Sequence, residues 1–270
     1  MAQKTFVARP MNDVSEFNSQ VDIIIPYYGQ YEKVTQLLES IFRLTRSNFY
    51  RVYIVDDCSP NEVYLEKINE NARKNAERLR QDNVVTVVRN EVQKGFGGAC
   101  KAGFDLGESP YVCFINSDCL VRDTGWLRAL GESLLKLKDQ GVRVVAPMTN
   151  NAVGGHEAQT GNLFLREPDD IILTDGEHIS LYCFMCHRAL FSKIGGFLKE
   201  YPYGFFEDEE FAARLKKYGY KQAICRRSFI EHEGEATVRS LWRQKPDVAK
   251  IMQEDNRQRC IEDMKKLDQK

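Results

Sequence analysis

The order of short apolar runs and helical stretches is the feature that most constrains the fold of this chain. Four runs are rich in β-branched or aromatic residues and are expected to be buried strands: Val21–Pro26, Arg51–Val55, Asn83–Val88 and Tyr111–Ile115. Apolar residues recur at helical spacing over Tyr31–Leu44 and Asn61–Arg80, and the Gly-rich stretch Gly95–Leu106 precedes the fourth run. This alternation predicts an α/β fold with a parallel, Rossmann-like sheet flanked by helices.

The rest of the chain is less regular. We predict, in order, a helix over Asp123–Lys138, a strand over Val142–Pro147, a polar loop over Thr149–Thr160, a strand over Ile179–Cys186, a short helix over His187–Ile194, an acid-rich helix ending at Tyr218, and one long strand or a strand pair over Lys221–Ile230. Residues 1–20 show no clear periodicity and are expected to form an extension, whereas the charged tail from residue 239 is expected to be helical.

Polar residues follow the fourth strand, and the carboxyl ends of strands in an open α/β sheet form the ligand crevice. Here the chain reads Asn116-Ser117-Asp118. Asp118 at such an end could hold Mg²⁺ or Mn²⁺ against a phosphate, because carboxylate oxygens are hard ligands. Asn, Ser and Asp also favour turns and helix N-caps, so these residues alone leave both interpretations open.

The other strand ends give weaker signals. Tyr28 could stack on a base or simply pack in the core. Asp57 could accept a hydrogen bond from a base or a ribose, or cap the helix that follows it. Gly95 could bring the backbone close to a phosphate at a helix N-terminus, and Lys101 could add positive charge there, although a solvated lysine is the ordinary alternative.

Four consecutive acids, Glu207 to Glu210, follow two phenylalanines. Repulsion in a partly apolar setting can raise the pKa of a carboxylate towards the range of a general base. The alternative is a solvated helix start, since acids in a first turn suit the helix dipole. His232 lies between acids at the expected end of a strand, where a structural or exposed histidine is more common than a ligand.

Composition narrows the function classes. The net charge of −1 gives no global basic field for nucleic acid or a membrane surface. Cys183 and Cys186 form a C-x-x-C pair, but no second pair at usable spacing completes a zinc site. The spread of the eight cysteines suggests reduced thiols and a cytoplasmic setting, and no apolar run resembles a signal peptide or a membrane span.

Six segments in order resemble the family-two glycosyltransferases with the GT-A fold. They read Ile-Ile-Pro-Tyr-Tyr from residue 24, Val-Asp-Asp-Cys-Ser-Pro from 55, Gly-Phe-Gly-Gly-Ala from 95, Phe-Ile-Asn-Ser-Asp from 114, Lys-Ile-Gly-Gly-Phe from 193 and Phe-Phe-Glu-Asp-Glu-Glu-Phe from 205. Each is weak alone, but their order and spacing make a specific pattern from Val21 to Thr237. The resemblance divides the chain into an N-terminal extension (1–20), a GT-A domain (21–238, with a nucleotide-binding half, 21–120, and an acceptor-binding half, 121–238) and a helical tail (239–270).

The resemblance also implies site roles. The residues expected to contact the donor nucleotide are Pro26, Tyr28, Asp57, Gly95, Lys101, Asn116 and Ser117. Asp118 is expected to bind the divalent metal, Mn²⁺ or Mg²⁺, with His232 beside the metal or the diphosphate. Asp208 is expected to be the general base. The acceptor side is expected to include Gly196, Phe197 and Glu207.

One position departs from the family pattern, because Asn116 stands where the first Asp of Asp-x-Asp is usual. Asn supplies no charge, but it can hydrogen-bond a ribose hydroxyl or bind a metal through its carbonyl. The implied activity is inverting transfer of a sugar from a UDP- or dTDP-sugar to an acceptor hydroxyl, in glycan biosynthesis. The acceptor could be a glycan, a lipid-linked sugar or a protein, with nucleic acid disfavoured, and peripheral contact with a membrane stays open.

Two other functions compete with this one. A nucleotidyltransferase would carry a Gly-rich, basic phosphate loop after its first strand, and here that strand ends Pro-Tyr-Tyr-Gly-Gln. A sugar-nucleotide-binding module with a weakened or lost catalytic site would permit Asn116 but would not explain the acids at 207–210.

Overall fold

The computed structural model describes residues 17–45, 50–61, 63–79, 84–152, 154–164, 167–198, 201, 204–234 and 246–268. Most of the expected N-terminal extension and the first residues of the expected tail lie outside these ranges. Within them no helix is both long enough and apolar enough to cross a membrane. The described end of the extension packs on the domain, because Phe17 is buried with its ring 4.9 Å from that of Tyr111.

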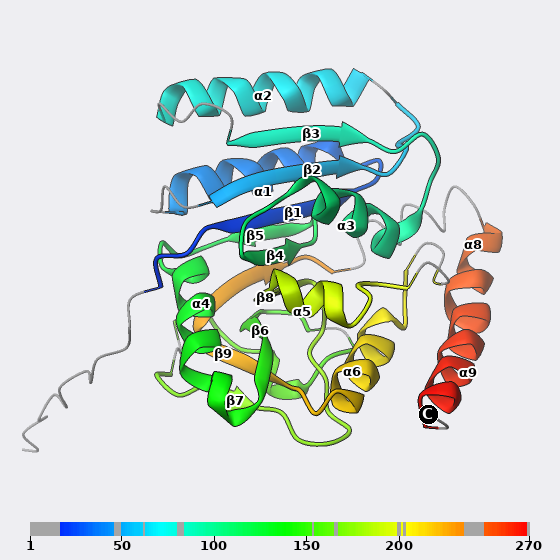
Figure 1. The fold of residues 1–270 in the computed structure, drawn as a ribbon. Coiled ribbons are helices and arrows are strands. Elements are labelled where there is room, and N and C mark those ends of the chain that lie inside the picture. The colour runs from blue at the N-terminus through cyan, green and yellow to red at the C-terminus, as the bar shows by residue number, and fades with distance from the viewer. Residues whose placement is uncertain are drawn as a thin grey trace, which may run out of the picture.

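The N-terminal half is a parallel sheet, as the alternation predicted (Figure 1). Its elements are β1 (Val21–Tyr27), α1 (Tyr31–Leu44), β2 (Tyr50–Asp56), α2 (Val63–Leu79), β3 (Val85–Arg89), α3 (Gly95–Leu106) and β4 (Tyr111–Ile115). The strand order is β3-β2-β1-β4, and each neighbouring pair is parallel. The carboxyl ends of all four strands therefore lie at the same edge of the sheet.

The C-terminal half extends the same sheet with mixed strand directions. Its elements are β5 (Cys119–Val121), α4 (Trp126–Leu137), β6 (Val142–Met148), β7 (Ile171–Ile172), β8 (Cys183–His187), α5 (Arg188–Lys193), α6 (Glu207–Lys217) and β9 (Lys221–His232), with short 3-10 turns η1 (Lys138–Gln140) and η2 (Glu157–Gln159). The order continues β4-β8-β6-β9-β5, with β8 antiparallel to both β4 and β6. One long strand, β9, pairs with β6 over its first part and with β5 at its C-terminal end, next to the tip of β4.

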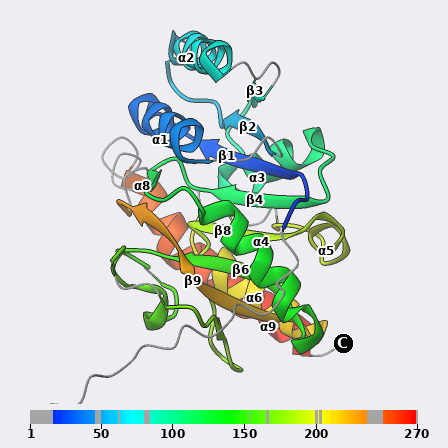
Figure 2. The ribbon, with the colours of Figure 1, turned by 90° about the vertical axis from the view of Figure 1, so that its left-hand side faces the viewer.

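Successive side chains of the strands pack alternately into two apolar layers, one on each face of the sheet. Ile23 and Ile25 face the layer formed with α1, α2 and α4, whereas Ile24 faces the layer formed with α3, α5 and α6. Figure 2 shows these helices on the two faces of the sheet. Strands buried on both faces need continuous apolar sequence, which is why the Ile-Ile-Ile run at residues 23–25 is a strand.

One predicted strand is shorter than expected, and one observed strand was missed. The strand predicted over Ile179–Cys186 begins only at Cys183, and residues 179–182 form a loop with Tyr182 accepting a hydrogen bond from the backbone N–H of Asn116. The short strand β5 was not predicted. Its three residues are too few to show a period, and only pairing with β9 makes them a strand.

The described part of the tail is helical, as expected. It comprises α8 (Pro246–Lys250), a π-helical turn η3 (Ile251–Asp255) and α9 (Asn256–Asp268). These segments continue one another and lie beside α6 (Figure 1).

Candidate active site

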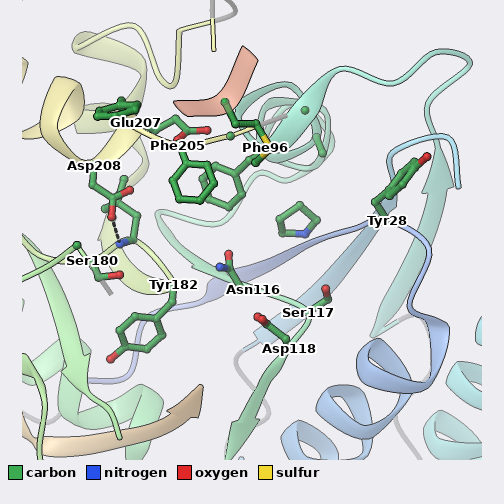
Figure 3. A pocket seen from close by; sticks show the side chains of 18 of the residues that line it. Tyr28, Phe96, Asn116, Ser117, Asp118, Ser180, Tyr182, Phe205, Glu207 and Asp208 are labelled. Atoms are coloured by element: carbon green, nitrogen blue, oxygen red, sulfur yellow. Dashed lines mark hydrogen bonds between the residues drawn. The ribbon is translucent and has the colours of Figure 1, made fainter. Parts of the chain in front are cut away.

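The strand ends of both halves open into one cavity of about 300 Å³. The candidate residues that line it are Pro26, Tyr28, Asp57, Gly95, Asn116, Ser117, Asp118, Glu207, Asp208 and His232. Asp118 and Asp208, ninety positions apart in the chain, thus share one cavity, and Figure 3 shows them on different sides of it.

The tip of β4 carries Asp118 and two further polar residues. Figure 3 shows Asn116, Ser117 and Asp118 in sequence along the cavity wall, with Tyr28 to one side of them. The Oδ1 atom of Asn116 is buried and has no hydrogen-bond partner among the described residues. An unpaired buried carbonyl oxygen costs free energy unless a ligand or water satisfies it, so this atom fits a polar ligand in the cavity.

Asp118 and His232 form the best candidate metal site of the described chain. The Nε2 atom of His232 lies 3.5 Å from Oδ1 of Asp118, while Nδ1 lies 2.9 Å from the carbonyl oxygen of Asn151. A proton on Nδ1 donated to that carbonyl leaves the Nε2 lone pair facing Asp118, the arrangement typical of metal-ligating histidines. Cys119, opposite His232 in the β5–β9 pair, completes a group of ligand atoms within 4.8 Å of one another.

The surroundings hold His232 in this orientation. Its ring stacks on that of Tyr182 with centroids 4.9 Å apart, and Asn150 accepts the hydrogen bond of its backbone N–H. Burial lowers the pKa of His232, but the hydrogen bond and negative charge of Asp118 outweigh it, and the pKa is raised overall. The imidazole is therefore electrostatically tied to Asp118.

Asp208 has the setting of a general base. Burial raises the pKa of Asp208 from 3.8 to about 6, and the charge of Glu209 adds to this, while the Leu181 N–H and the nearby His178 oppose it. The Leu181 N–H donates to Oδ2 of Asp208 at 3.0 Å, which orients the carboxylate (Figure 3). Such a group is largely ionised at neutral pH yet basic enough to accept a proton.

Glu207 is more deeply buried than its neighbour. It is 5 % exposed, and its Oε1 atom has no hydrogen-bond partner among the described residues. Burial, followed by the charges of Asp208 and Glu210, raises its pKa to about 8. At neutral pH the side chain is therefore largely a neutral acid that can donate a hydrogen bond into the cavity.

The backbone before α6 is strained. Gly204, Phe205 and Phe206 have φ angles of 112°, 77° and 70°. Positive φ is rare for bulky L residues, and such strain clusters at functional sites. The turn directs Phe205, Phe206, Glu207 and Asp208 to the cavity.

Asp57 accepts three hydrogen bonds from residues that are distant in the sequence. Its carboxylate accepts hydrogen bonds from the backbone N–H groups of Lys94 and Gly95 at 2.9 and 2.8 Å, and from the side chain of Asn90 at 2.9 Å. The alternative that Asp57 caps the helix following it is therefore wrong, because its carboxylate binds the first N–H groups of α3 instead. Asp57 holds the Gly95 turn at the cavity edge.

Three candidates do not line the cavity. Lys101 is exposed on α3 and pairs with Asp105 one helical turn away. Gly196 and Phe197 lie behind the wall, where the Phe197 ring packs 5.1 Å from that of Phe96. A Cβ atom at Gly97 would come within 2.8 Å of Phe197, so the Gly-rich segment allows this close packing.

Several lining residues carried no sequence signal. His178 lies near enough to Asp208 to influence its pKa, although its position in a loop said little. Tyr182 was expected on a strand, and Met252 belongs to the tail. Each reaches the cavity through chain reversals that no local pattern encodes.

Comparison with known proteins identifies the family. A family model described as "Glycosyl transferase family 2" matches residues 22–195, more than half of the chain. The chain belongs to glycosyl transferase family 2. A protein of Haemophilus influenzae described as an uncharacterized glycosyltransferase is 33% identical over 98 residues, which are 36% of this chain and 29% of that protein.

Solved structures of glycosyltransferases share the fold. "GalNAc-T7 with UDP, GalNAc and Mn2+" matches with a TM-score of 0.64 and 16% identity, over 81% of this chain and 44% of that one. The mannosyltransferase PcManGT of Pyrobaculum calidifontis "in complex with GDP-Man and Mn2+" matches with a TM-score of 0.60 and 17% identity, over 88% and 64%. TarS 1-349 of S. aureus "in complex with UDP-GlcNAc" matches with a TM-score of 0.55 and 16% identity, over 78% and 58%. These likenesses confirm the GT-A fold, and this family 2 chain spans less than two thirds of each of these relatives.

Proposed function

We propose that this chain transfers a sugar from a nucleoside diphosphate donor to an acceptor hydroxyl with inversion at the anomeric carbon. The observation that carries the proposal is that Asp118 and Asp208 line one cavity from different sides. Single displacement requires that the leaving group and the attacking hydroxyl lie on opposite faces of the sugar. Asp118 is thus available on the side of the leaving group, and Asp208 on the side of the attacking hydroxyl.

Asp118 and His232 would hold the divalent cation, Mn²⁺ or Mg²⁺. Their 3.5 Å separation and the Asn151 carbonyl behind His232 fit this role, and the relatives GalNAc-T7 and PcManGT were solved with Mn²⁺. When bound, such a cation acts as a Lewis acid that stabilises the negative charge of a departing diphosphate. Asn116 replaces an acid here, and its buried Oδ1 atom accepts a hydrogen bond from a ribose hydroxyl of the donor.

Asp208 removes the proton of the acceptor hydroxyl. The hydroxyl oxygen forms the new bond to the anomeric carbon as the bond from that carbon to the diphosphate oxygen breaks, and the electron pair leaves with the nucleoside diphosphate. The Leu181 N–H keeps the carboxylate oriented, and the pKa of about 6 leaves it ionised at pH 7. Glu207, a neutral acid at that pH, donates a hydrogen bond to a hydroxyl on the acceptor side.

The nucleotide pocket is formed by Pro26, Tyr28 and the Gly95 turn that Asp57 holds. UDP- and dTDP-sugars are the donors we propose, in keeping with the UDP and UDP-GlcNAc of the relatives, although PcManGT holds GDP-Man. The acceptor is a glycan, a lipid-linked sugar or a protein hydroxyl.

One assay tests the function against its rivals. The chain is incubated with UDP-, dTDP- and GDP-sugars and Mn²⁺, with and without simple glycoside acceptors. We expect release of nucleoside diphosphate. Formation of pyrophosphate with a nucleoside triphosphate and a sugar phosphate would instead indicate a nucleotidyltransferase. Tight binding without turnover would indicate the binding module that Asn116 permits.

A further inference from the structure

The C-terminal helices contact both sides of the cavity. Met252 on η3 is fully buried and lines the cavity. It packs with Tyr28 and Val248 in a small apolar cluster, against which Phe205 also lies. One side chain of the tail therefore connects the wall that carries Tyr28 with the strained turn before Asp208.

A second contact reaches the backbone of that turn. Asn256, the first residue of α9, is fully buried, and its Nδ2 atom donates a hydrogen bond of 2.7 Å to the carbonyl oxygen of Gly204. Gly204 begins the three successive residues with positive φ. Conformations of this kind persist only where surrounding contacts maintain them, and the amide of Asn256 is one such contact.

The π-helical turn lies at the point of contact. Met252 and Asn256 are four positions apart and both are buried, whereas Gln253, Glu254 and Asp255 between them are exposed. π turns are rare and frequently occur at functional sites. Here the turn contains Met252, which reaches the cavity, and is followed directly by Asn256, which contacts the strained backbone.

Further contacts hold the tail against α6 and against Tyr201, which precedes it. The Tyr201 hydroxyl donates to Oδ2 of Asp263 at 3.3 Å. The thiol of Cys260 lies 3.9 Å from Oε2 of Glu209, which is the residue after Asp208. The tail is therefore attached along the element that carries the acids, and not only at its end.

We propose that the C-terminal helices are part of the active site, with Asn256 a positioning residue for Asp208 and Met252 a residue that limits the size of the cavity beside Tyr28. The inference rests on the proposed function, because the exact placement of Asp208 matters only if it is the base. It adds a function to the tail beyond its packing against α6.

The first test separates positioning from binding. In Asn256→Ala, we expect kcat to fall between about tenfold and 10²-fold, because a displacement of about 1 Å in a reacting group costs that much. The affinity for UDP with Mn²⁺, measured by calorimetry, should stay within about twofold, since Asn256 does not line the cavity. Gln253→Ala, an exposed change on the same turn, is the matched control and should leave both quantities unchanged.

The second test concerns Met252. In Met252→Ala we expect affinity for UDP with Mn²⁺ to weaken about tenfold, because most of a buried apolar side chain is removed from the wall. Met252→Leu keeps the volume and should restore affinity to within about twofold. A purely structural role would lower the melting temperature of Met252→Ala and leave the affinity of the folded protein unchanged, and that result would overturn the assignment of Met252.

Comparison of Asn256→Ala with Asp208→Asn separates the positioning role of Asn256 from the proposed role of Asp208 as the base. If Asn256→Ala is folded and has normal kcat while Asp208→Asn is inactive, the positioning role of Asn256 is wrong and the proposed function stands. If Asp208→Asn retains activity, the base assignment is wrong, and Met252 is still judged by calorimetry. Should Asn256→Ala fail to fold, Asn256→Ser, which keeps a polar side chain too short to reach Gly204, takes its place with the same expected fall in kcat.

Discussion

The pH dependence of transfer tests the role of Asp208 most directly. Burial and the charge of Glu209 raise its pKa from 3.8 to about 6. If only the ionised carboxylate accepts the proton of the acceptor, kcat follows the ionised fraction. For a pKa near 6 this fraction is about 0.9 at pH 7 and about 0.1 at pH 5, so kcat should fall about tenfold between these two pH values.

The assay is steady-state release of nucleoside diphosphate from pH 4.5 to 8.5, with saturating donor and acceptor, constant ionic strength and fixed Mn²⁺. Asp208→Asn should lose about 10²–10⁴-fold in kcat, the usual contribution of a positioned base. Glu209→Gln removes a charge that raises the pKa of Asp208, so the acid limb should move to lower pH while kcat at pH 7 changes little.

Two results would refute this reasoning. Near-normal kcat in Asp208→Asn would show that another group, or water, receives the proton. An acid limb with the same midpoint in Asp208→Asn as in the wild type would assign that limb to a different titrating group.

Three further predictions concern the rest of the site. Asp118→Ala should abolish the Mn²⁺ dependence of UDP binding, and unchanged calorimetric affinity with and without Mn²⁺ in the wild type would contradict the metal site. Asn116→Asp restores a second acid and should raise Mn²⁺ affinity about tenfold by calorimetry, since added ligand charge strengthens binding of hard cations; an equal or weaker affinity would argue that Asn116 faces the ribose alone. Glu207→Gln should stabilise the protein by about 1–3 kcal/mol at pH 8.5 and lower its activity. The sign follows because the folded pKa of Glu207 is about 8 against 4.5 for an ordinary glutamate, so the folded state binds more protons between these values and the wild type loses stability as pH rises through them. Urea unfolding at pH 4 and 8.5 checks this, and a wild type that gains stability at the higher pH would contradict it.

Much of the fold could be predicted from the sequence because its signals are local. The helix from Tyr31 to Leu44 was predicted with its observed bounds, and the first four strands were located within about two residues. The convergence of Tyr28, Asp57 and Asp118 on one edge also followed, since parallel strands have their carboxyl ends on the same side. β-branched runs and helical spacing depend on neighbouring residues only, so one sequence suffices to show them.

The sequence could not assign roles to residues whose partners are distant in the chain. Asp57 caps α3 rather than α2 because β2 and the Gly95 turn meet only in the folded sheet. Lys101 could have added charge to a phosphate site or been an ordinary solvated lysine, and its helical phase directs it to Asp105 and solvent.

What the sequence by itself determined is the alternation of strands and helices, and the family pattern carried by six short segments. The tertiary structure alone decided that Met252 of the tail reaches the cavity, that Asn256 contacts the turn before Asp208, and that burial separates Glu207, with a pKa of about 8, from Asp208, with a pKa of about 6. The physical reason is that periodicity is a property of the chain, whereas burial and charge–charge distance depend on which distant segments surround a side chain.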